Sequence, residues 1–317
     1  MYDRQTDRAK ALASRIHARP YAGDLEEMLR RERLDAVSIC TPPWLHASQT
    51  VQTLEADVHV LVEKPMAMTE AECRRMCEAA SRHGRKLCVS HNFLFSRSVS
   101  KVRQRIADGH AGRIESFLGF QMSTPRRRLP DWYASLPGQL FFDEAPHLVY
   151  LSRRFLGPAE PVLVGASSFQ AGTEDVQRTQ NVISVLRGSS GLGVLTMTFN
   201  ASRAEWGMVV AGSKESYIID LFRDQLVVLG LGGAHTPGEV LGQTISGITQ
   251  ITAGAITSGS LHATRRLLYG HQELIDGFLT AILEDAEVPV PGEEGLRTIA
   301  LLESICDRAE LVSGERP

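Results

Sequence analysis

Three short apolar runs separated by helical segments constrain the fold of this chain more than any other feature. The runs cover residues 36–40, 59–62 and 87–90, and the periodicity of residues 45–55 and 69–83 between them is helical. Strands that alternate with helices through short connections form parallel sheets, because each crossover returns the chain to the same end of the sheet. We therefore expect a doubly wound parallel sheet in the N-terminal part.

A different pattern begins near residue 96. Six alternating runs follow one another with glycine-rich turns, at residues 161–169, 180–187, 193–200, 206–211, 216–220 and 225–229. Consecutive strands joined by tight turns predict a mostly antiparallel sheet. We expect an α/β, Rossmann-like domain over residues 1–95 and an α+β domain over residues 96–317. Residues 232–260 are rich in Gly, Thr and Ser, and fit either an irregular insertion or an element that is flexible or contacts a partner.

The composition excludes several functional classes. With 317 residues and a formal net charge of −3, the chain has room for two domains and no global charge that favours nucleic acid or an anionic membrane. No apolar run approaches the roughly 18 residues of a spanning helix, and the charged N-terminus does not resemble a secretory signal. Five scattered cysteines fit reduced thiols, and Cys73 and Cys77 are expected to be buried rather than to bind a metal. The composition predicts a cytoplasmic protein that binds neither nucleic acid nor a membrane.

The triplet Glu63-Lys64-Pro65 stands at the end of the second apolar run. Proline ends a strand because it has no backbone N–H to donate. Open α/β sheets bind ligands beyond the carboxyl ends of their strands. The triplet therefore puts a carboxylate and an amine where a ligand is expected.

The triplet belongs to a longer series of motifs. The series comprises Thr41-Pro-Pro-Trp-Leu-His46, Val58-His-Val-Leu-Val-Glu-Lys-Pro-Met-Ala-Met-Thr69, His91-Asn92, Gly138-Gln-Leu-Phe-Phe-Asp143 and His147. It resembles the glucose-fructose oxidoreductase / inositol dehydrogenase (Gfo/Idh/MocA) family over most of the chain. The resemblance implies a Rossmann domain, a C-terminal domain with an open sheet, and NAD or NADP as cofactor. It also implies a sugar, cyclitol or related polyol as substrate, and a homo-oligomer, a dimer or tetramer, formed through the C-terminal sheet.

The resemblance points to Lys64 and His147 as the reacting pair. Hydride transfer from a carbinol carbon requires a group that accepts the hydroxyl proton and a charge that stabilises the alkoxide. An imidazole exchanges protons near neutral pH, and a lysine supplies charge, or acts as the base where burial lowers its pKa. Asp143 lies four residues before His147, so the two share one helix face. Its carboxylate is expected to orient the imidazole or to bind a substrate hydroxyl.

Other motif residues are expected at the cofactor. By the same resemblance, Glu63 hydrogen-bonds the nicotinamide ribose beside Lys64, while Thr41, Pro42 and His46 line the cofactor cleft. Each of these residues also fits ordinary turn or capping chemistry.

Three features are expected near the substrate. Asn92 is predicted to contact the substrate or the nicotinamide. Trp132 either forms a wall of the substrate cleft or serves as packing. The run Arg126-Arg-Arg128 either binds an anionic group of the substrate or is a solvated charged face.

The chain departs from the family pattern at its start. Members begin with a strand and a Gly-x-Gly-x-x-Gly turn that holds the pyrophosphate, and the 27 glycines here contain no such spacing. Residues 1–3 match the end of the second strand, where Asp3 would bind the adenosine ribose and favour NAD, whereas Arg4 argues for NADP. We expect a truncated chain, through either a misassigned start or a real loss.

Two functions follow from the pattern as it stands. The first is an NAD(P)-dependent oxidoreductase, and the alternative is a non-catalytic binding or scaffolding protein of the same fold. Gln139 and Ala145 replace common glycines of the family, and Tyr150 replaces an acidic residue three positions after His147. These changes are expected to reshape the substrate pocket.

Overall fold

The structure is a computed structural model that describes residues 1–124, 126, 131–136, 138–167 and 181–313. The chain divides into two compact units, each with its own sheet. The first unit comprises Met1–Ser90 and Thr280–Leu296, and the second comprises His91–Leu279 and Arg297–Pro317.

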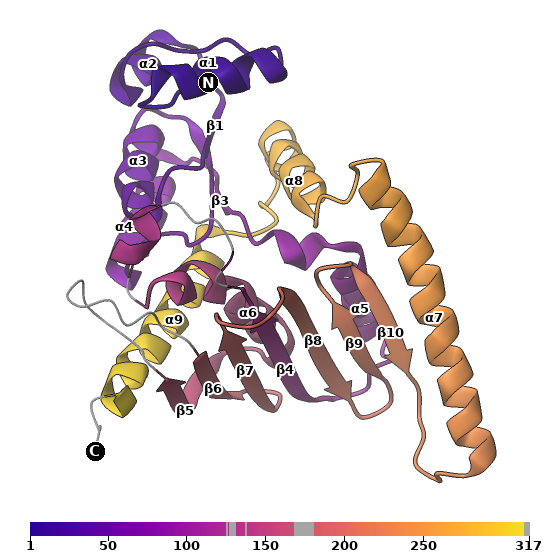
Figure 1. The fold of residues 1–317 in the computed structure, drawn as a ribbon. Coiled ribbons are helices and arrows are strands. Elements are labelled where there is room, and N and C mark those ends of the chain that lie inside the picture. Colours follow the sequence, from indigo (N-terminus) through magenta and orange to yellow (C-terminus); the bar gives the residue numbers. More distant parts are fainter. Residues whose placement is uncertain (125, 127–130, 137, 168–180, 314–317) are drawn as a thin grey trace. The chain divides into compact units, whose positions relative to one another are not determined.

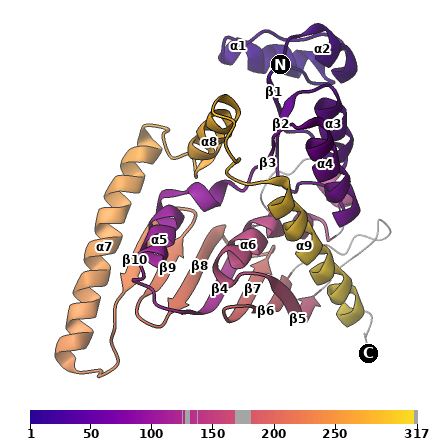
Figure 2. The same ribbon diagram turned by 180° about the vertical axis from the view of Figure 1, so that it is seen from behind.

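A parallel sheet in the order β1-β2-β3 forms the centre of the first unit (Figures 1 and 2), as the strand-helix alternation predicts. Val60 pairs with Val37 on one side and with Leu87 on the other, and its side chain is fully buried. The elements are α1 (Thr6–Arg15), α2 (Leu25–Arg31), β1 (Ala36–Ile39), α3 (Pro43–Glu55), β2 (His59–Val62), α4 (Glu70–His83) and β3 (Leu87–Val89). Helices α3 and α4 pack against each other, and α3 also packs on β1 and β2.

The first unit ends at Ser90, close to the predicted boundary at residue 95, but it also includes Thr280–Leu296. The prediction from the sequence placed that segment in the second domain. Val89 donates its backbone N–H to Val290 at 3.0 Å, and Cys88 forms an isolated antiparallel bridge with Pro291. Such a pairing between distant segments leaves no periodic signal in the sequence.

A seven-stranded sheet in the order β10-β9-β8-β4-β7-β6-β5 forms the second unit. All neighbours are antiparallel except β4 and β7, so the predicted, mostly antiparallel sheet is confirmed. The strands are β4 (Ile114–Met122), β5 (Ala159–Ser167), β6 (Asn181–Gly188), β7 (Leu192–Thr198), β8 (Glu205–Gly212), β9 (Ser216–Asp220) and β10 (Gln225–Leu229). The helical elements are η1 (Asn92–Phe95), α5 (Arg97–Ala107), η2 (Asp131–Ser135), α6 (Leu140–Leu156), α7 (Pro237–Ala263), α8 (His271–Leu283) and α9 (Gly292–Ser313). The last turn of α8 and the first turn of α9 belong to the first unit.

Among the described residues, helices cover one face of this sheet and leave the other open. Figure 2 shows α5 and α6 in front of the strands, and α6 packs on β4, β6 and β7. Along β4, Phe117 points inward and is 1% exposed, whereas Leu118 is 41% exposed. Ile183 on β6 and Leu192 on β7 are likewise exposed. The open sheet implied by the family resemblance is present.

The expectation of an irregular insertion at residues 232–260 is wrong. Most of that segment forms α7, a helix of 27 residues along the edge strand β10 (Figure 1). Thr236 caps the helix by accepting the N–H of Glu239 at 3.3 Å, and Pro237 occupies the first turn. The low helix propensity of its Gly, Thr and Ser residues concealed it, because tertiary contacts with β10 stabilise a helix that local preference does not favour.

Candidate active site

The predicted site residues other than Asp3 divide into two groups, one in each unit. The strand-end cluster consists of Thr41, Pro42, His46, Glu63 and Lys64 in the first unit. The α6 cluster consists of Asn92, Trp132, Asp143 and His147 in the second unit.

Parallel pairing explains why the strand-end cluster forms. Ile39 pairs with Val62 at the ends of β1 and β2, so Thr41 and Glu63 leave the sheet at the same edge. Glu63 continues the ladder by donating its N–H to Ile39 at 2.9 Å. Glu63 and Lys64 are partly exposed, and the peptide bond between Lys64 and Pro65 is cis. An ionisable pair therefore stands at the carboxyl edge of the sheet, as predicted.

His46 holds the two loops of this edge together. Its Nδ1 lies 2.8 Å from the carbonyl oxygen of Pro65, and its Nε2 lies 2.7 Å from that of Thr41. The side chain is 1% exposed, and burial lowers its pKa, although the two carbonyl groups oppose that shift. Because both ring nitrogens contact the backbone, His46 positions the loops that carry Thr41 and Lys64.

The described residues fit the nicotinamide-ribose end of a dinucleotide better than its pyrophosphate. Glu63 has a carboxylate, the kind of group that binds ribose hydroxyls in such folds. The Thr41 hydroxyl donates to Gln49 at 2.7 Å. Helix α3, which follows β1, begins at Pro43 with Pro42 as its N-cap. Prolines have no N–H, so this helix start offers few donors to a phosphate. Asp3 lies outside the assigned strands and accepts the N–H of Gln5 at 2.7 Å.

Helix α6 presents Asp143 and His147 on one face, as the four-residue spacing predicts. Asp143 is 5% exposed, and the Tyr133 hydroxyl donates to its Oδ2 at 2.9 Å. Trp132 stacks on Tyr133 with ring centroids 4.2 Å apart and an angle of 10° between the rings. In the structure Trp132 therefore supports the tyrosine that holds Asp143.

His147 lies in an aromatic setting that the sequence did not reveal. Its ring packs edge to face against two aromatic rings, with centroids 4.9 Å apart for Phe93 and 5.3 Å apart for Trp206. Its Nδ1 lies 2.9 Å from the hydroxyl oxygen of Tyr150. Phe93 and Trp206 come from η1 and β8, far apart in the chain, so no local pattern could have marked them.

Tyr150 connects His147 to the residues after β3. Its hydroxyl oxygen accepts the N–H of Phe93 at 3.2 Å, and its ring stacks on His91 with centroids 4.2 Å apart. Burial lowers the pKa of His91 to about 3, with a smaller contribution from Arg153. His91 is thus a neutral, buried ring that supports Tyr150.

The remaining predicted residues, Asn92 and the arginine run, differ in burial. Asn92 is 4% exposed and donates its amide to the carbonyl oxygen of Tyr269 at 3.0 Å. Arg126 is exposed, and Arg127 and Arg128 lie outside the described residues. Glu144 was not predicted, yet it is 2% exposed and accepts from the Ser123 hydroxyl at 3.2 Å. Its carboxylate gives the second unit another buried acid beside Asp143.

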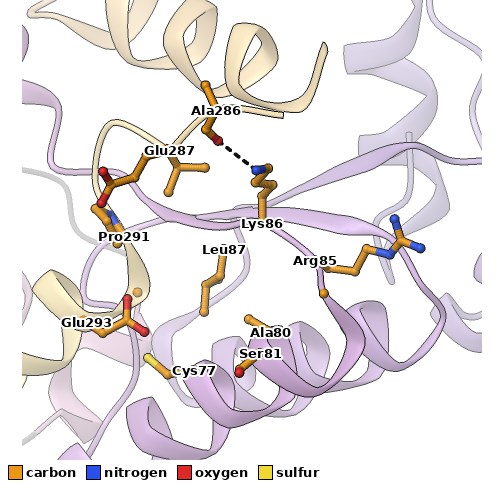
Figure 3. A pocket seen from close by; sticks show the side chains of 13 residues that line it. Cys77, Ala80, Ser81, Arg85, Lys86, Leu87, Ala286, Glu287, Pro291 and Glu293 are labelled. Carbon is orange, nitrogen blue, oxygen red and sulfur yellow. Dashed lines mark hydrogen bonds between the residues drawn. The ribbon is translucent and has the colours of Figure 1, made fainter. Parts of the chain in front are cut away.

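A pocket of about 350 Å³ lies elsewhere, within the first unit (Figure 3). Its walls come from the end of α4, the start of β3 and residues 286–293. Lys86 at its rim donates to Asp285 and to the carbonyl oxygen of Ala286, each at 2.8 Å. The pocket contains none of the predicted site residues. Nor, among the described residues, is there a group of three or more His, Cys, Asp or Glu arranged to hold a metal, or a helix that could span a membrane.

Comparison with known proteins places the chain in a family. Residues 1–91 match the model "Oxidoreductase family, NAD-binding Rossmann fold", and residues 99–218 match the "GFO/IDH/MocA C-terminal domain". The chain belongs to the Gfo/Idh/MocA family of oxidoreductases. The resemblance stated from the motifs is confirmed, and with it the Rossmann-like and mixed-sheet domains.

Similar proteins include two curated enzymes and a solved structure. The 1-carboxy-3-chloro-3,4-dihydroxycyclohexa-1,5-diene dehydrogenase of Comamonas testosteroni is 31% identical over 52% of this chain and 41% of its own length. The D-glucoside 3-dehydrogenase of Escherichia coli K12 is 29% identical over 53% of this chain and 49% of its own. This Gfo/Idh/MocA chain thus spans about half the length of these relatives. The WlbA dehydrogenase of Bordetella pertussis, solved with NADH and UDP-GlcNAcA, has a TM-score of 0.79 at 22% identity, covering 99% of this chain and 87% of its own.

Proposed function

We propose that this protein is an NAD(P)-dependent oxidoreductase that moves a hydride between a nicotinamide cofactor and a hydroxyl-bearing carbon of a sugar, cyclitol or related polyol. Family membership supports the reaction class. The relatives named for a glucoside and a dihydroxylated ring support a cyclic polyol as substrate. NAD is favoured over NADP by Asp3.

His147 carries the proposal, because its ring combines an aromatic enclosure with a defined hydrogen-bond partner. For the oxidation direction, His147 accepts the substrate hydroxyl proton at Nε2 while Nδ1–H donates to Tyr150. The Tyr150 oxygen has two lone pairs, so it can accept from both His147 and the N–H of Phe93. The bound nicotinamide supplies the hydride acceptor.

Lys64 and Asp143 have supporting roles in this proposal. The Lys64 ammonium stabilises the alkoxide that forms as the proton leaves. Asp143, held by Tyr133, accepts a second hydroxyl of the substrate. Glu63 binds the nicotinamide ribose, and Asn92 is the remaining polar group proposed to contact the ligand. Association through the open face of the sheet, as a dimer or tetramer, belongs to the same proposal.

The test is direct binding followed by turnover. The purified chain is titrated with NADH and NADPH by fluorescence, then assayed with NAD and a panel of sugars, cyclitols and glucosides. His147→Ala and Lys64→Met are expected to lower kcat/KM by about 10²–10⁴-fold, whereas Lys101→Met, an exposed lysine on α5, leaves it unchanged. A folded chain that binds neither nucleotide contradicts the proposal and supports the non-catalytic alternative.

A further inference from the structure

Helix α7 turns its polar side to the protein. Gln250 accepts the N–H of Val228 at 2.8 Å and donates to its carbonyl oxygen at 3.1 Å, which satisfies both edge groups of β10 at that residue. The Ser258 hydroxyl donates to the carbonyl oxygen of Arg223. Gly254 lies midway between Gln250 and Ser258 and lets α7 approach β10 closely, since a Cβ at this position would lie 3.3 Å from a side-chain carbon of Gln225.

The opposite side of α7 is apolar and exposed. We call this side the outer face; its large members are Leu241, Ile245, Ile248 and Ile256, with exposed fractions of 60%, 55%, 60% and 70%. At 3.6 residues per turn these positions lie on one side of the helix. Amphipathic helices normally bury such a stripe. The arrangement on α7 is the reverse, and it leaves a hydrophobic strip for another molecule.

The outer face has the size and charge of a protein interface. A helix of 27 residues is about 40 Å long and about 10–12 Å wide, so half its perimeter amounts to roughly 700 Å². A standard interface buries about 800 Å² per partner. No Asp, Glu, Lys or Arg occurs between Glu239 and Arg265. A helix that lies on a membrane carries Lys and Arg along its polar side, so a second protein surface fits α7 better.

The distribution of large and small residues fits a second copy of α7 in antiparallel orientation. With a two-fold axis at Thr252, Ile248 of one copy faces Ile256 of the other. Ile245 then faces Gly259, where nothing lies within 4 Å of the position of a Cβ, and Leu241 faces Ala263. Large residues therefore meet small ones away from the centre, as close packing requires.

The charges at the helix ends agree with this register. The same axis brings Glu239 of one copy opposite Arg265 of the other, and the two helix dipoles run antiparallel. In a two-fold interface each contact occurs twice, so the pairing of Glu239 with Arg265 forms at both ends of the helix pair. We propose that α7 is a self-association surface, through which two copies of this chain pair antiparallel about Thr252. This interface is separate from any contact through the open sheet.

The first experiment measures mass in solution. Sedimentation at 1–100 µM is expected to show that Ile248→Asp halves the mass of the wild-type assembly, whereas Ala253→Asp, about 140° around the helix at 100° per residue, leaves it unchanged. Ala253 is exposed on the same helix. Circular dichroism checks that both variants remain folded. A wild-type chain that is monomeric at 100 µM, or a mass insensitive to Ile248→Asp, overturns the proposal.

The second experiment tests the register without relying on a disruptive charge. It uses a Cys40→Ser background, since Cys40 is the exposed cysteine of the described residues. Mixing chains with Ile248→Cys and chains with Ile256→Cys is expected to give a disulfide-linked dimer on oxidation, and Ile248→Cys alone much less. Equal linkage by Ile248→Cys alone indicates a parallel pair and overturns the antiparallel register. Adding Ile183→Asp on the open sheet should leave the disulfide cross-link intact. Loss of the cross-link in that variant would assign the association to the sheet instead. Co-sedimentation of a monomeric chain with anionic vesicles would assign the outer face of α7 to membranes.

Discussion

The hydroxyl oxygen of Tyr150 lies 2.9 Å from Nδ1 of His147 and also accepts the backbone N–H of Phe93 at 3.2 Å. One phenol thus ties the candidate base on α6 to the segment that follows β3. The tyrosine stands three residues after the histidine, where the family pattern has an acid. Because a phenol is neutral, it orients the imidazole without adding the negative charge that would favour the protonated ring.

Removal of this hydroxyl tests its structural contribution. Tyr150→Phe keeps the ring that stacks on His91 but leaves the Phe93 N–H without this acceptor. A buried donor that loses its acceptor costs about 1–3 kcal/mol, so the free energy of unfolding should fall by that amount in urea titration. Tyr21→Phe, at a partly exposed tyrosine, should change it by less than about 0.5 kcal/mol. Equal effects of the two variants would contradict the role given to the hydroxyl.

Restoring an acid at this position should alter the pH dependence. Within the proposed function, Tyr150→Asp places a carboxylate beside Nδ1 of His147, and this negative charge favours the protonated imidazole. Since the neutral imidazole is the base, the rising limb of kcat against pH should move to higher pH. Tyr150→Asn, which adds no charge, should leave the limb where it is. A limb that moves equally in both variants would show that charge is not the cause.

His91 should make the protein sensitive to acid. Its folded-state pKa is lowered to about 3 from 6.5 by burial, so the unfolded chain binds more protons than the folded chain between these pH values. Stability is therefore highest above pH 6.5 and falls as pH falls through this window, by about 1.4 kcal/mol per pH unit from this group. In His91→Phe that contribution is absent. Urea titrations at pH 7, 5.5 and 4.5 should show a shallower loss for the variant; parallel curves would rule the effect out.

His46 should contribute more to stability than an exposed histidine. His46→Ala removes the side chain that joins the carbonyl groups of Thr41 and Pro65, and leaves a buried cavity. We expect the free energy of unfolding to fall by about 2–3 kcal/mol. His83→Ala is the control, because His83 is partly exposed and its contact with Asp57 spans 3.5 Å. A loss below that of the control would show that the two loops are held by other contacts.

Asp224 should stabilise α5 from a distant part of the chain. Its carboxylate accepts the N–H of Arg97 at 3.2 Å, the N–H of Ser98 at 2.8 Å and the Ser98 hydroxyl at 2.6 Å. Asp224→Ala leaves these donors buried, at a cost of at least about 1.5–3 kcal/mol. Asp108→Ala, at the exposed end of the same helix, should cost far less. Thermal unfolding of both variants provides the measurement.

Periodicity and motif spacing determined a large part of the fold and of the candidate site. The apolar runs at β1, β2 and β3 and the alternating runs from β5 to β10 were predicted because a buried strand must be apolar on its inward side. That Asp143 and His147 share one face of a helix followed from helical geometry alone. Glu63 and Lys64 at the sheet edge followed from a strand that ends at proline.

The contacts between distant segments became visible only in the folded chain. Phe93 from η1 and Trp206 from β8 pack against His147 on α6, a meeting of distant segments that no local pattern records. The return of residues 280–296 to β3 and the helical state of residues 237–263 depend on contacts with β3 and β10. Local sequence encodes which side of an element is apolar, and long-range packing decides what that side covers. For this reason the motifs of the chain were enough to predict its family, while the setting of His147 and the outward apolar face of α7 emerged from the fold.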